Sequence, residues 1–129
     1  MINPFQQHGA FSWSELMTTD LQGAEDFYVK VFGWSMSDGP VEDMEYRVIS
    51  AGGQGVGGMM SIPPHVEQMQ PHWRATVTVD DIDATAKLAE ELGGKVLMQP
   101  QDIPTVGRFA VFQDPQGAVI TAITYLQKA

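Results

Sequence analysis

The chain has 129 residues, which is long enough for one domain with a core between two packed layers. Hydrophobic residues make up 43% and charged residues 18%, as in ordinary globular proteins. Sixteen acidic and seven basic residues give a net charge of −9, which argues against nucleic acid and anionic membranes as partners. The chain has no cysteine, so disulfides, thiolate nucleophiles and thiolate metal sites are excluded.

No apolar segment approaches the roughly 20 residues of a membrane span. The first residues lack the basic and apolar regions of a signal peptide. We therefore expect a soluble, cytoplasmic protein.

The first half of the chain predicts a strand, a helix and three further strands. Asp20 is a suitable helix N-cap, apolar residues follow it at helical spacing, and Gly33 is a suitable stop. The predicted strands cover residues 11–18, 34–37, 46–51 and 56–62.

The same order recurs after a proline-bounded linker over residues 63–71. Asp81 is the predicted N-cap of the second helix, and Asp114 to Gly117 form a predicted turn before the last strand. The predicted elements are a strand over residues 73–79, a helix over 82–92 and strands over 95–99, 108–113 and 118–125.

The two halves are related as an internal repeat, and two alignments of the halves are possible. The first alignment pairs Trp13 with Trp73. The second alignment is displaced by a single position, so that it pairs Asp20 with Asp81 and brings Trp13 opposite Arg74. Because neighbouring residues of a strand point to opposite faces, either Trp73 or Arg74 lines the functional face of its strand, and the sequence leaves both open.

This doubled order resembles the glyoxalase/bleomycin-resistance/dioxygenase superfamily, also called vicinal oxygen chelate, over residues 9–126. The motifs that carry the resemblance are residues 19–28, 32–34, 79–84 and 114–117. Residues 11–20, 102–104 and 107–111 are similar to a glyoxalase-like bacterial subgroup. The resemblance implies an α+β fold in a single domain, residues 1–129, whose two tandem strand-helix-three-strand modules, about 9–62 and 72–126, pair into a curved-sheet cup.

Metal-using members of this superfamily place His or Glu at inward positions of the first and last strand of each module. The corresponding positions here hold Trp13, Ser61, Arg74 and Thr121. None of these offers the imidazole or carboxylate that zinc, nickel or iron prefers. We therefore expect no metal and no cofactor.

Glu15 is the candidate catalytic residue. It lies two residues after Trp13 and so shares its face of the first strand, in an otherwise apolar segment. A buried carboxylate needs a partner, and Arg74 is the natural candidate. Two interpretations stay open: an ion pair that only orders the cup, and a pair that grips or protonates a ligand.

Aromatic and methionine side chains on these strands suit either a packed core or a flat apolar ligand. Asp102 and Arg108 are interpreted as rim residues without an assigned role. The expected ligand-binding residues are Trp13, Glu15, Met17, Met59, Ser61, Arg74, Thr76 and Thr121.

The run from Gly53 to Gly58 has the spacing of a dinucleotide-binding fingerprint. It is followed by a predicted strand and not by a helix, so no helix N-terminus is available to hold a pyrophosphate. A glycine-rich hairpin is the better interpretation.

The sequence is compatible with three functions. The leading one is a metal-free protein of the bleomycin-resistance type that binds a small apolar or aromatic ligand with an oxygen acceptor. The second is a superfamily enzyme, a lyase, isomerase or hydroxylase, that uses Glu15 as acid or base. The third is a dimeric interaction module, and in every case we expect a homodimer.

Overall fold

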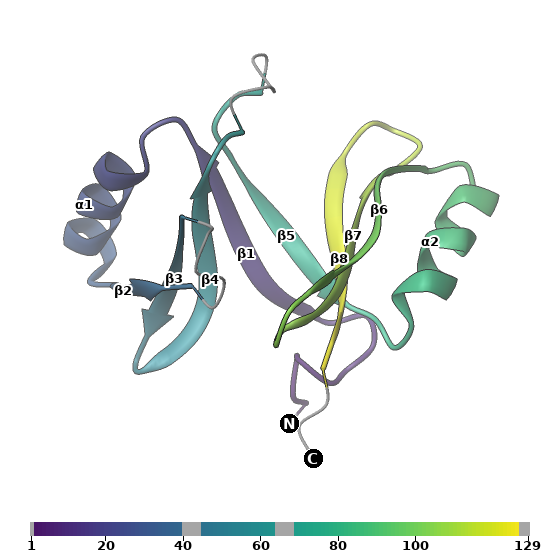
Figure 1. The fold of residues 1–129 in the computed structure, drawn as a ribbon, viewed down its shortest axis with the longest axis horizontal. Helices are drawn as coiled ribbons and strands as arrows, with labels where there is room; N and C mark the ends of the chain where they lie inside the picture. The colour runs from purple at the N-terminus through teal and green to yellow at the C-terminus, as the bar shows by residue number, and fades with distance from the viewer. Residues whose placement is uncertain (1, 40–44, 64–68, 127–129) are drawn as a thin grey trace. The chain divides into compact units, whose positions relative to one another are not determined.

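The computed structural model of the chain describes residues 2–39, 45–63 and 69–126 (Figure 1). Most of the predicted linker, residues 64–68, lies outside the described residues. The elements are β1 (Phe11–Thr18), α1 (Leu21–Phe32), β2 (Ser35–Asp38), β3 (Tyr46–Ala51), β4 (Gln54–Ser61), β5 (His72–Thr78), α2 (Ile82–Glu91), β6 (Lys95–Ile103), β7 (Gly107–Gln113) and β8 (Val119–Tyr125).

The predicted α+β class and the doubled strand-helix-three-strand order are confirmed. The largest difference is β6, which was expected to end at Gln99 and continues to Ile103. Pro100 lies inside this strand, where the register with β7 shifts between Met98 and Gln101. An irregular edge strand tolerates proline because the missing N–H does not interrupt a regular ladder.

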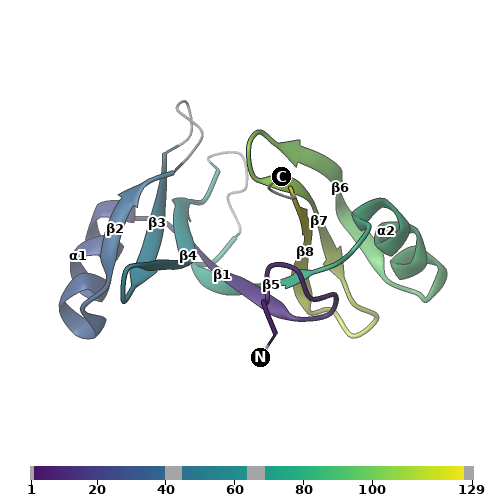
Figure 2. The ribbon, with the colours of Figure 1, turned by 90° about the horizontal axis from the view of Figure 1, so that it is seen from below.

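The described chain divides into two compact units. The first unit is Trp13–Arg74, and its strands are ordered β2, β3, β4, β1. β1 pairs with β4 in parallel, and the other pairs are antiparallel. Helix α1 packs against the strands of this unit (Figure 2). The core between them consists of Leu16, Leu21, Ile49 and Met59.

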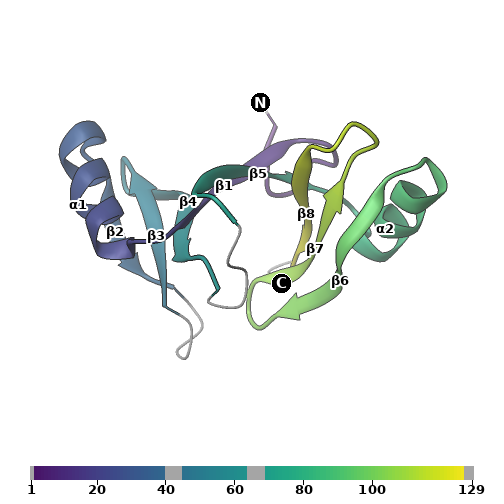
Figure 3. The ribbon, with the colours of Figure 1, turned by 90° about the horizontal axis from the view of Figure 1, so that it is seen from above.

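The second unit consists of residues 1–12 and 75–129, with strands ordered β5, β8, β7, β6. β5 and β8 are parallel, and β8, β7 and β6 form an antiparallel meander. Helix α2 lies against this meander (Figure 3). The core beneath α2 consists of Val79, Ile82, Ala86, Ala110, Phe112 and Ala122.

Residues before β1 belong to the second unit. The N–H of Gly9 donates to the carbonyl of Thr78 at 2.8 Å, and the Thr78 hydroxyl donates to the carbonyl of Pro4 at 2.6 Å. His8 accepts a hydrogen bond from the backbone N–H of Asp80 at 2.9 Å. These bonds attach the N-terminal segment to the end of β5.

Both helices begin as predicted. The Asp20 carboxylate accepts from the N–H of Gly23, and the Asp81 carboxylate accepts from the N–H groups of Asp83 and Ala84. Each bond satisfies a helix N–H that has no partner within the helix. The two caps are equivalent positions of the repeat, so the alignment that pairs Asp20 with Asp81 is correct at the helices. In the described part of the chain, neither α1 nor α2 is long and apolar enough to cross a bilayer.

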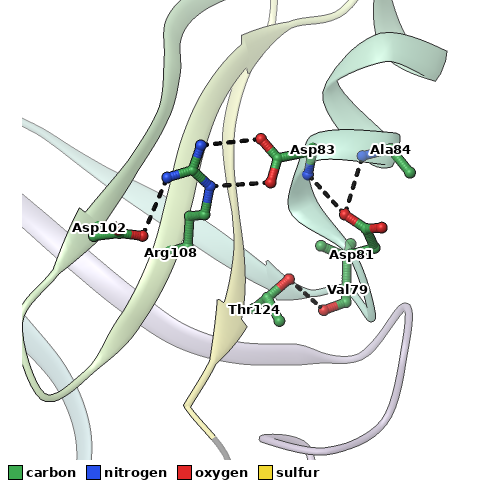
Figure 4. A network of polar contacts seen from close by, with 7 residues as sticks. All are labelled: Val79, Asp81, Asp83, Ala84, Asp102, Arg108 and Thr124. Carbon is green, nitrogen blue, oxygen red and sulfur yellow. Dashed lines mark hydrogen bonds and ion pairs between the residues drawn. The ribbon is translucent and has the colours of Figure 1, made fainter.

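Arg108 joins three elements of the second unit (Figure 4). Its guanidinium donates from Nε and Nη2 to the two carboxylate oxygens of Asp83 on α2, each at 3.0 Å, and from Nη1 to Asp102 on β6 at 3.1 Å. The Arg108 hydrogen bonds and charge hold the pKa of Asp83 below its ordinary value of 3.8. Arg108, left without a role by the sequence, therefore attaches α2 to the sheet, and Asp102 binds the same guanidinium from β6.

We predict that Arg108→Ala lowers the melting temperature modestly, and that the loss is smaller in high salt because the three side chains are exposed to solvent. The folded pKa of Asp83 is depressed, so its contribution is complete at neutral pH and disappears as the pH falls through the folded pKa. Thermal unfolding of wild type and variant at several salt and pH values measures this effect. Lys87→Ala on α2 removes the same charge and is the control; an equal loss in both variants would contradict the prediction.

Candidate functional site

The register between β1 and β4 sorts their side chains onto two faces. Glu15 lies opposite Gly58, and Leu16 lies opposite Met59. Leu16 and Met59 belong to the core beneath α1, and Met59 is fully buried there. The structure therefore places Met59 on the face opposite Glu15, away from the predicted ligand site.

Tyr46, which sequence reasoning missed, crosses β4 to reach Glu15. The Tyr46 side chain extends from β3, and its ring lies over Gly58. A Cβ added at Gly58 would overlap the Tyr46 hydroxyl. The Tyr46 hydroxyl donates to Glu15 Oε2 at 2.8 Å and accepts from Trp13 Nε1 at 2.9 Å. A signal in the sequence could have indicated this contact. Gly58 lies in the middle of β4, and a glycine inside a strand often marks a place where another group approaches the backbone closely.

Arg74 is the fourth member of this cluster. Its side chain is only 14% exposed, and its Nη2 lies 3.9 Å from Glu15 Oε1, which is an ion pair but not a hydrogen bond. The Arg74 side chain makes no hydrogen bond with any described residue, and its Nε is buried without a partner. A buried N–H that has lost water and gained no acceptor is costly, and most buried polar groups in proteins are paired.

Arg47 in the same unit shows the usual arrangement. Its Nε donates to Glu25 at 3.0 Å, and its other nitrogens lie within 4 Å of Asp38 and Glu45. Arg47 is thus balanced by carboxylates of its own chain. Arg74, by contrast, has no hydrogen-bond acceptor for its guanidinium among the described residues.

The structure places Arg74, and not Trp73, beside Glu15. Arg74 shares the face of Glu15, whereas Trp73 donates from Nε1 to the Tyr28 hydroxyl at 3.2 Å. Trp73 also contacts the Tyr28 ring edge to face, with centroids 5.4 Å apart. Arg74 is therefore the counterpart of Trp13, as the alignment of the two helix caps requires.

The remaining predicted site residues are Met17, Ser61, Thr76 and Thr121. Met17 is buried, and Ser61 is exposed at the end of β4, opposite Thr18. Thr76 and Thr121 are buried in the second unit and lie opposite each other on β5 and β8.

The strand pairing of the two modules changes one of the residue equivalences that the sequence predicted between them. In the alignment that pairs the two helix caps, Thr76 corresponds to Glu15, and it lies opposite Thr121 as Glu15 lies opposite Gly58. The first-module counterpart of Thr121 is therefore Gly58 and not Ser61.

A second feature of the first unit is a cluster of aromatic rings. Tyr28 stacks on Phe32 and Trp34 and contacts Phe27 and Trp73 edge to face. Phe27, Phe32 and Trp73 are 58%, 60% and 40% exposed. These five residues, called the aromatic cluster below, place a large apolar surface in contact with solvent.

Residues 10–121 match the Glyoxalase/Bleomycin resistance protein/Dioxygenase superfamily. The chain belongs to this superfamily. The resemblance inferred from the sequence motifs is thereby confirmed.

Two curated relatives are similar over most of this chain. "Putative glyoxylase CFP32" of Mycobacterium tuberculosis (strain CDC 1551 / Oshkosh) is 42% identical over 116 residues, which cover 89% of this chain and 44% of the relative. "Anthracycline biosynthesis protein DnrV" of Streptomyces peucetius is 34% identical over 115 residues, covering 89% of this chain and 41% of the relative. The chain spans less than half the length of these relatives.

Solved structures agree on the fold. Methylmalonyl-CoA epimerase from Mycobacterium tuberculosis superimposes with a TM-score of 0.68, at 14% identity, over 95% of this chain and 91% of the epimerase. A methylmalonyl-CoA epimerase in complex with methylmalonyl-CoA and NH4+ gives a TM-score of 0.64 at 15% identity, over 91% of this chain and 94% of that enzyme. At such identities the similarity concerns the fold alone.

The residues present do not suit the divalent metal that members of the superfamily use. The positions expected to hold ligands carry Trp13, Ser61, Arg74 and Thr121, and the strand register gives Gly58 as the counterpart of Thr121. None of these residues provides an imidazole or a carboxylate. In the ranges that the structure describes, no three His, Asp or Glu side chains gather closely enough to bind a metal ion.

We predict that Arg74→Met leaves the free energy of unfolding unchanged within about 0.5 kcal/mol or raises it, because it removes a poorly paired buried charge. Arg47→Met, the matched control, should lose about 1 to 2 kcal/mol because it breaks a hydrogen bond between charged groups. Urea unfolding at neutral pH gives both values. A loss for Arg74→Met as large as that for Arg47→Met would identify Arg74 as a structural residue.

Proposed function

We propose that this chain binds a small organic ligand through an oxygen acceptor that Arg74 holds, and that it does so without a metal ion. The observation that carries this proposal is the buried Arg74 Nε, which has no acceptor among the described residues. A ligand oxygen would supply the missing hydrogen bond, and a charged donor makes that bond strong.

The local charge supports an anionic or polar oxygen despite the net charge of −9. Surface charges are screened over roughly 8 Å at physiological salt, whereas a buried guanidinium is screened less and donates in fixed directions. Glu15 is 23% exposed and only 3.9 Å away, so it balances part of this charge without occupying a hydrogen bond of Arg74.

Partly buried rings of Trp13 and Tyr46 lie beside the charged pair. Such rings offer flat apolar contact area, and they favour a ligand with an aromatic or apolar part next to its oxygen. Superfamily relatives with names from glyoxylase chemistry and anthracycline biosynthesis are consistent with a small-molecule ligand.

An enzyme of the superfamily is the second candidate, with Glu15 as acid or base. Glu15 Oε2 is held by Tyr46, while Oε1 faces Arg74. A carboxylate in this position can accept a proton from a bound ligand, and the negative charge left on the ligand oxygen would be stabilised by Arg74. The fold that the chain shares with epimerases is compatible with this chemistry.

We further propose a cytoplasmic homodimer. The exposed rings of the aromatic cluster support a protein contact, because apolar patches of this kind commonly mark interfaces.

Benzoate is a suitable first probe because it combines an aromatic ring with an oxygen acceptor. We predict that wild type binds benzoate and that Arg74→Ala weakens binding at least about tenfold. One charge-assisted hydrogen bond contributes roughly 1.5 kcal/mol, which corresponds to a change of about this size in the dissociation constant. Arg108→Ala, which removes an arginine of the second unit, should bind normally, and a chelator should have no effect. Calorimetry with unchanged affinity in Arg74→Ala, or with affinity lost on chelation, would refute the proposal.

Light scattering at micromolar concentration should give twice the mass of 14.1 kDa for the chain. Phe32→Glu should shift this mass toward the monomer because it places a charge within the aromatic cluster. Leu97→Glu on β6, which changes another exposed apolar residue, is the control. A monomeric wild type would rule out the dimer.

A further inference from the structure

Given the function proposed above, we propose that Tyr46 is a positioning residue for Glu15. It fixes Glu15 as a hydrogen-bond acceptor whose second oxygen faces the ligand. The site then selects ligands that carry a hydroxyl or N–H donor directly beside the oxygen acceptor held by Arg74.

The direction of the hydrogen bonds follows from the groups involved. The Trp13 indole N–H can only donate, so the Tyr46 hydroxyl oxygen accepts at 2.9 Å. The Tyr46 hydroxyl has one proton, and it donates this proton to Glu15 Oε2 at 2.8 Å. Oε2 therefore accepts one hydrogen bond from Tyr46, and the carboxyl group is oriented by a chain of two bonds.

The other oxygen of Glu15 is available to a ligand. Among the described residues, Oε1 has its ion-pair partner in Arg74 Nη2, and the 3.9 Å between them is too long for a hydrogen bond. Arg74 presents donors, including the unpaired Nε, and Glu15 Oε1 presents an acceptor beside them. A ligand that carries an acceptor and a donor side by side can accept a hydrogen bond from Arg74 and donate one to Glu15 Oε1 at the same time.

A ligand with two adjacent acceptors is disfavoured by the same arrangement. One of its oxygens would face Glu15 Oε1 without a proton between them, which leaves a polar contact unsatisfied in a half-buried place. The discrimination depends on the orientation of Glu15, and that orientation depends on Tyr46.

Gly58 makes this arrangement possible. It is the residue of β4 directly opposite Glu15, and a Cβ there would overlap the Tyr46 hydroxyl. Any other residue at this position would push the hydroxyl away from the carboxylate, even with Tyr46 itself unchanged.

The test compares two probes that differ in the donor and in one methyl group. Salicylate has a hydroxyl beside its carboxylate, and 2-methoxybenzoate has an acceptor oxygen at the same place. Calorimetry should show that wild type binds salicylate at least about tenfold more tightly, as expected for one hydrogen bond to a charged group. In Tyr46→Phe this preference should fall to about threefold or less, while binding of 2-methoxybenzoate changes little.

Tyr28→Phe is the matched control because it removes a hydroxyl that also accepts from a tryptophan indole, but within the aromatic cluster. It should keep the full preference for salicylate. Gly58→Ala should lose the preference as Tyr46→Phe does. In proton–nitrogen NMR without ligand, Tyr46→Phe should shift the indole N–H signal of Trp13, and Tyr28→Phe should shift that of Trp73.

The outcomes separate this inference from the function on which it rests. If Tyr46→Phe keeps the wild-type preference, or if wild type has none, Tyr46 does not position Glu15 for selection, although Arg74 can still hold the carboxylate. If Arg74→Ala binds both probes as wild type does, the proposed function itself is wrong. An unshifted Trp13 signal in Tyr46→Phe would overturn the hydrogen-bond chain directly.

Discussion

The candidate site depends on one feature of the sheet, the parallel pairing of β1 with β4 in a register that sets Glu15 opposite Gly58. Because Gly58 has no side chain, the Tyr46 ring can lie across β4 and reach the Glu15 carboxylate. A slip of one residue would place Met59 opposite Glu15 and would exchange the two faces of the strand. The core beneath α1 prevents such a slip, since Leu16 and Met59 are both buried there.

The arginines of the chain show which charges serve the fold. Arg47 and Arg108 are each bound to carboxylates from other elements at about 3 Å, and they hold a helix onto its sheet. Arg74 is more deeply buried than either and has only a long ion pair. Proteins generally retain an uncompensated buried group where function needs it, because selection for stability alone would remove it. This contrast separates Arg74 from the structural arginines.

Local signals in the sequence predicted the order of the helices and strands. Asp20 and Asp81 cap the two helices, and each bond joins residues two or three positions apart, so the pattern of neighbours determines it. Strand ends were less certain, as the extension of β6 through Pro100 shows, because pairing with β7 decides where a strand ends. The pairing of Glu15 with Arg74 was also expected, since a buried carboxylate requires a cationic neighbour.

Residue types and short-range order were enough to predict the order of the elements. The resemblance that these motifs carry then implied the superfamily, and with it the positions that lack imidazole and carboxylate ligands. Three further facts needed the folded structure: Arg74 and not Trp73 faces Glu15, Met59 belongs to the core, and Tyr46 joins the site. These facts depend on strand register and on contacts between residues that lie far apart in the chain. The sequence pattern is almost unchanged when the alignment moves by a single position, whereas in the sheet the same move takes every side chain to the other face.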